Sequence, residues 1–64
     1  MDGKPHIGDE VIVRYGKRGG IYDAMDGRRG RIVAVSNDLR GYVCEVAVDD
    51  RRVFLSPRNL EAAP

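Results

Sequence analysis

The sequence of 64 residues predicts an all-β protein, a small and highly bent β-barrel of five short strands. Two segments begin at a turn signal and continue directly into a short run of β-branched residues: Gly-Asp-Glu-Val-Ile-Val-Arg at 8–14 and Gly-Arg-Arg-Gly-Arg-Ile-Val-Ala-Val at 27–35. Residues 42–48 alternate between an apolar and a mixed face, as a half-buried strand does. A chain of this length buries only about 60% of the surface that its unfolded form exposes, so we expect one domain.

The first strand is expected at residues 10–15, where Val11 and Val13 form an apolar face. Residues 16–30 contain five glycines and are expected to form a long loop. A loop of this length in so small a domain is either functional or partly disordered. We favour a functional loop, because three apolar residues could hold it against the barrel: Ile21, Tyr22 and Met25.

The second strand is expected at residues 31–36, and it does not alternate cleanly. The spacing of Gly30, Ile32 and Val35 instead predicts a bulge or a sharp bend, which a small barrel needs at its corners. A hairpin loop at residues 37–41 then leads into the third strand, the clearest of the chain.

The C-terminal third of the sequence predicts two more strands. Asp49 and Asp50 form a tight acidic turn, and residues 51–55 pair back as the fourth strand. Pro57 fixes φ and cannot extend a ladder of hydrogen bonds, which predicts a single 3₁₀ turn over residues 56–59. Residues 60–62 form the closing strand.

These elements define the expected core and the domain limits. The core residues are Val11, Val13, Cys44, Val46 and Val48, with Ile32 or Val33 and Leu60. We expect a flexible N-terminal arm at residues 1–6, the barrel at 7–62 and a tail at 63–64.

The charges are unevenly distributed along the chain. Residues 14–31 carry six basic and two acidic side chains, a net charge of +4, which leaves −3 for the remainder of a chain with net charge +1. Such clustering can form a basic patch on the folded surface. The six basic residues are Arg14, Lys17, Arg18, Arg28, Arg29 and Arg31.

Five strands, a long first loop and a turn before the last strand resemble the SH3-like barrel over residues 7–62. Within it, residues 27–35 resemble the KOW motif of ribosomal proteins and transcription elongation factors, a resemblance that implies contact with RNA or protein. The layout is also similar to that of a small photosystem I subunit, which implies a docking surface. The sequence also resembles the type II dihydrofolate reductase, an enzyme built from four barrels. However, residues 53–56 read Val-Phe-Leu-Ser where that enzyme has Val-Gln-Ile-Tyr.

The sequence offers no convincing catalytic or metal-binding constellation. Cys44 lies on the apolar face of a strand, and a buried small hydrophobe is the better interpretation than a nucleophile. His6 has no second metal ligand at a useful spacing, and the carboxylates of Asp49 and Asp50 point apart in a turn. We therefore expect neither an enzyme nor a cofactor. The first residues and the short apolar runs suggest no signal peptide or membrane span, and we expect a cytoplasmic protein.

The leading hypothesis is a binding module for RNA or single-stranded DNA. The six basic residues named above would neutralise phosphates, and Tyr15 or Tyr22 would stack on an unpaired base. In the competing hypothesis the same loop docks onto an acidic protein partner or a sister subunit, which the low net charge favours. We also expect a homo-oligomer, because an apolar outer wall is expected from Ile12, Val43, Ala47 and either Phe54 or Val53.

Overall fold

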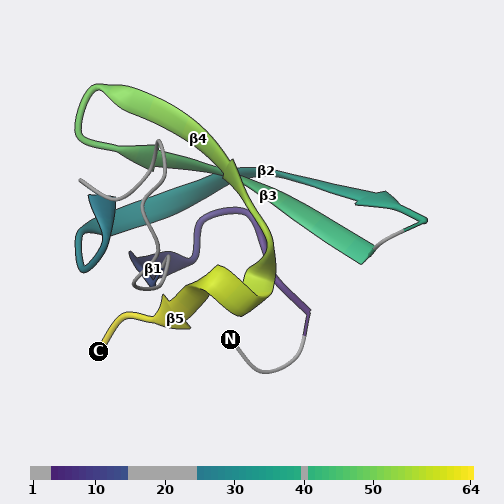
Figure 1. Cartoon of the computed structure of the whole chain (residues 1–64), viewed down its shortest axis with the longest axis horizontal. Helices are drawn as coiled ribbons and strands as arrows, with labels where there is room; N and C mark the ends of the chain where they lie inside the picture. The colour runs from purple at the N-terminus through teal and green to yellow at the C-terminus, as the bar shows by residue number, and fades with distance from the viewer. Residues whose placement is uncertain (1–3, 15–24, 40) are drawn as a thin grey trace.

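The computed structural model describes residues 4–14, 25–39 and 41–64. In this part of the chain five antiparallel strands form one sheet: β1 (Glu10–Val13), β2 (Arg29–Asp38), β3 (Gly41–Val48), β4 (Arg51–Leu55) and β5 (Leu60–Ala62). The strand order is β4-β3-β2-β1-β5, and the 3₁₀ helix η2 (Pro57–Asn59) connects β4 to β5 (Figure 1). The fold is therefore all-β, with β4 and β5 as the two outer strands of an open sheet.

The C-terminal half follows the sequence prediction closely. The bounds of β4 and β5 are as predicted, and η2 has Pro57 in its first turn. The backbone N–H of Arg58 donates to the Ser56 hydroxyl, which caps this short helix. The backbone N–H of Arg14 donates to the carbonyl of Asn59, so the end of η2 is attached to the end of β1.

The second strand is longer than predicted at both ends. Arg29 pairs with Ile12 of β1, so β2 begins two residues earlier than expected. At the other end Asp38 pairs with Gly41, so the loop predicted at residues 37–41 is wrong and the ladder continues almost to the tip. The physical reason is that Gly41, with φ of 111°, permits a tight reversal that a residue with a side chain disfavours.

The predicted irregularity in β2 is confirmed. The register with β3 shifts between Ile32 and Ala34, so Val33 forms a bulge. Just before it, Gly30 approaches β3 very closely: a Cβ atom there would lie 2.7 Å from the carbonyl oxygen of Ala47. The strand can take this path only because residue 30 has no side chain.

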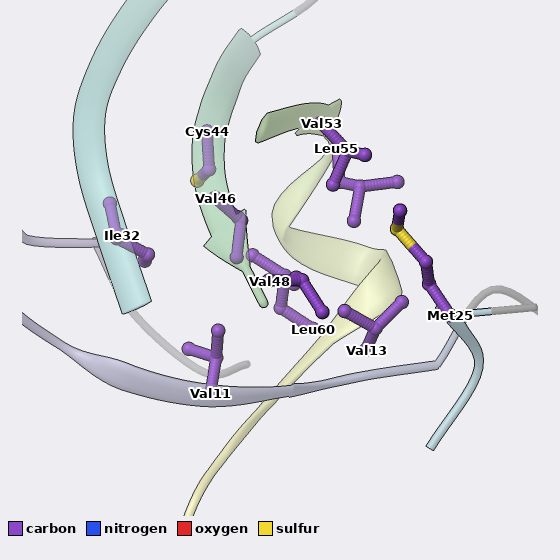
Figure 2. Packing of buried hydrophobic residues seen from close by; sticks show 10 residues of the cluster. All are labelled: Val11, Val13, Met25, Ile32, Cys44, Val46, Val48, Val53, Leu55 and Leu60. Atoms are coloured by element: carbon purple, nitrogen blue, oxygen red, sulfur yellow. The ribbon is translucent and has the colours of Figure 1, made fainter. Parts of the chain in front are cut away.

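One hydrophobic core lies against the inner face of the sheet, and Figure 2 shows its side chains converging from all five strands and from Met25. All the predicted core positions are buried. Of the two alternatives in the second strand, Ile32 is buried in the core and Val33 is only half-buried. Val53 also faces the core, because it pairs with Val46, and its neighbour Phe54 is 60% exposed on the outer face. The core consists of Val11, Val13, Met25, Ile32, Cys44, Val46, Val48, Val53, Leu55 and Leu60. Among the described residues, no helix is long and apolar enough to cross a membrane.

Candidate anion-binding surface

Four of the predicted phosphate-binding residues lie around the paired ends of β1 and β2. Arg14 directly follows β1, Arg28 directly precedes β2, and Arg29 and Arg31 belong to β2. Side chains two residues apart in a strand point to the same face, which places Arg29 and Arg31 together on the outer face of the sheet. The other four predicted residues lie outside the described part of the chain: Tyr15, Lys17, Arg18 and Tyr22.

Arg29 and Arg31 both bind the carboxylate of Glu10, a group of three residues that we call the arginine clamp. Arg29 Nη1 donates to Glu10 Oε2 at 3.1 Å, and Arg31 Nη2 donates to Oε1 at 3.0 Å. These hydrogen bonds, that from Arg31 first, lower the pKa of Glu10 below its ordinary value. The clamp is exposed to solvent, so it presents an oxyanion held between two guanidinium groups at the surface.

A shallow groove of about 240 Å³ runs beside the clamp. It is lined by the three clamp residues together with Gly30 and Ala47. Ala47 lies opposite Arg31 on β3, and its single methyl group leaves room next to the guanidinium group. The side chains of Arg29 and Arg31 are more than half exposed, so a ligand in solution can reach them.

The other two arginines also form ion pairs. Arg28 Nη1 lies 3.0 Å from Asp49 Oδ2, and Arg14 Nε lies 2.5 Å from Glu61 Oε2. The hydrogen bond to Glu61 raises the pKa of Arg14 above its ordinary value. Exposed pairs of this kind contribute little to stability because water and salt screen them, so they orient the side chains more than they stabilise the fold.

The acidic partners were missing from the sequence-based prediction. The carboxylates in the hydrogen bonds described above lie 19 to 47 residues from their arginines in the chain. Only the strand register reveals them, since Glu10 stands opposite Arg31 in the β1–β2 ladder. The described residues contain eight Lys or Arg and eight Asp or Glu, so this part of the molecule has no net charge.

Two residues considered for other chemistry take structural positions. The Cys44 side chain is fully buried in the core, and burial raises the pKa of its thiol. His6 Nδ1 lies 4.0 Å from Asp9 Oδ2 in the turn that precedes β1. In the part of the chain that the structure describes, no three metal-ligating side chains lie together.

No protein-family model matches the chain, and comparisons with curated proteins and with solved structures find no significant similarity.

Proposed function

We propose that the protein is a non-catalytic module that binds RNA or single-stranded DNA through contacts between its arginines and the phosphates. The observation that carries this proposal is the arginine clamp, in which two guanidinium groups converge on the two oxygens of one carboxylate. A phosphodiester offers the same pair of acceptor oxygens and the same single negative charge as Glu10. Guanidinium groups bind both kinds of oxyanion in this forked arrangement.

Glu10 would compete with a phosphate for the clamp, but a nucleic acid strand brings several phosphates. Arg14 follows the end of β1 and Arg28 precedes the start of β2, and their ion pairs are with the carboxylates of Glu61 and Asp49. Successive phosphates of a strand could replace these carboxylates, with release of counterions from the nucleic acid. We propose Lys17 and Arg18, which lie outside the described residues, as further phosphate contacts.

We also propose a specific type of barrel for this all-β fold. We infer an SH3-like barrel, supported by five antiparallel strands in the order β4-β3-β2-β1-β5 and by a 3₁₀ turn before the last strand. Gly30 and the bulge that follows it support the KOW-like interpretation of residues 27–35.

The proposal is tested by titrating a fluorescent oligothymidine at several salt concentrations. Each phosphate contact contributes a slope of about −0.7 in a plot of log affinity against log salt, so replacing Arg29 and Arg31 by glutamine should make the slope shallower by about 1.4. Glu10→Gln should strengthen binding, because it removes the competing carboxylate. Arg58→Gln is the matched control, since Arg58 is an exposed arginine of η2 away from the groove.

Two results would refute the nucleic acid function. One is an absence of binding by the wild-type protein at low salt. The other is binding that responds to Arg58→Gln as strongly as to the substitutions in the clamp.

A specific observation favours a second candidate, a protein-docking or assembly module. Phe54 is 60% exposed on the outer face, so a partner with an apolar contact surface would bury it, and the described residues as a whole carry no net charge that would repel such a partner. Sedimentation of the wild-type protein at high micromolar concentration separates the candidates. Self-association without oligonucleotide binding would support assembly, and a monomer that binds oligonucleotide would support the nucleic acid function.

A further inference from the structure

A second hollow, of about 410 Å³, lies between the N-terminal segment and the β2–β3 hairpin, away from the arginine clamp. It exists because the hairpin extends past the rest of the molecule (Figure 1), so its inner face continues beyond the core. Asn37 and Tyr42 are paired on this face, two residues further out than the pair of Val35 and Cys44. Pro5 is buried at the other side of the hollow.

The chemistry of this groove differs from that of the clamp. The Lys4 ammonium group lies 6.0 Å from the centroid of the Tyr42 ring, a cation–π contact. Its lining includes Lys4 and His6 but no carboxylate, although eight carboxylates occur among the described residues. Within that part of the chain Lys4 has no carboxylate partner, so the groove combines an aromatic face with a positive charge that no acidic side chain balances.

We propose that this groove binds one nucleotide of a single strand, an inference that rests on the proposed function and deepens it. The base would stack on the Tyr42 ring in the place that the Lys4 ammonium now occupies, and Lys4 would move to the adjoining phosphate. The Asn37 amide, which lines the groove on the same face as Tyr42, has both donors and an acceptor and can hydrogen-bond the edge of the base. An anionic aromatic ligand satisfies all of these groups at once.

The groove and the clamp can be tested separately because they are far apart along β2. Asn37 follows Arg31 by six residues, which corresponds to about 20 Å of strand. A mononucleotide is too short to reach both sites, whereas an oligothymidine of about twelve nucleotides falls in the range that small β-barrel binders cover. Replacing the Tyr42 ring should therefore act on stacking without changing the salt dependence, whereas the clamp variants should change the salt dependence.

The experiment measures the affinity of this oligothymidine by fluorescence polarisation for the wild type and for groove variants. Tyr42→Leu should weaken binding about tenfold, the loss of one base stack, with the salt slope unchanged. Tyr42→Phe keeps the aromatic face and should bind like the wild type. Lys4→Gln should make the salt slope shallower by about 0.7, and because Lys4 is exposed this variant tests the groove without disturbing the core.

The outcomes distinguish this inference from the proposed function. If Tyr42→Leu and Lys4→Gln both bind like the wild type while the clamp variants lose affinity, the groove inference is overturned and the function stands. If the wild type binds no oligonucleotide, both are overturned. If circular dichroism shows that Tyr42→Leu is unfolded, Lys4→Gln and Asn37→Ala test the groove in its place. Binding by both of these variants at the wild-type affinity overturns the inference.

Discussion

Replacement of Gly30 by alanine should destabilise the protein, although alanine is ordinarily the better residue within a strand. The added Cβ would lie 2.7 Å from the carbonyl oxygen of Ala47, 2.8 Å from Cγ1 of Val46 and 2.9 Å from Cγ2 of Val48. One extra carbon in a packed core costs about 1–3 kcal/mol. The unfolded chain has less backbone entropy with alanine than with glycine, which offsets about 0.5–1 kcal/mol of that cost. Because the nearest atom is a backbone oxygen, which cannot move aside as a side chain can, the cost lies at the upper end of the range of about 1–3 kcal/mol, and we expect the free energy of unfolding to fall by about 1–2.5 kcal/mol.

Urea denaturation followed by circular dichroism measures this change, which is a substantial fraction of the total stability of about 3–10 kcal/mol expected for a chain of this length. Gly8→Ala is the matched control: its Cβ would meet nothing within 4 Å, and it probes only the cost of a φ of 98°. Adding Val48→Ala to Gly30→Ala should restore little stability, because the contact with the carbonyl of Ala47 is backbone and remains. A Gly30→Ala variant as stable as the wild type would refute the close approach of β2 to β3.

Four further predictions follow from the same geometry. Val46→Ala should lower the free energy of unfolding by about 1–3 kcal/mol in urea, through the cavity that it leaves in the core. Because the pKa of Glu10 is lowered in the folded state, its ion pairs should stabilise the fold at pH values above the ordinary glutamate pKa and lose that effect as pH falls through the lowered pKa. In urea titrations the free energy of unfolding of Glu10→Gln should therefore fall less between about pH 7 and 3 than that of the wild type. Cys44 should react with a thiol reagent only as fast as the protein opens, and immediate labelling would contradict its burial. Phe54→Ser should abolish any self-association detected by sedimentation, and a dimer that survives it would exclude the outer face of β4 as the interface.

The sequence by itself determined the strands and most of the core, because a strand repeats every two residues and the pattern is visible locally. The alternation of Cys44, Val46 and Val48 identified buried positions correctly, and Pro57 marked the 3₁₀ turn. The spacing after Gly30 also predicted a bend, since glycine and a broken alternation are local signals as well.

Only the tertiary structure decided which side chains meet across the sheet. Whether Val53 or Phe54 faces the core depends on the register with β3, because a shift of one residue exchanges the two faces. The same holds for Glu10, whose position between Arg29 and Arg31 follows from the pairing of β1 with β2. Residues that bind one another here lie far apart in the chain, so no local pattern encodes their contact. The basic segment was visible in the sequence, but its balance by carboxylates arises only when the strands pair.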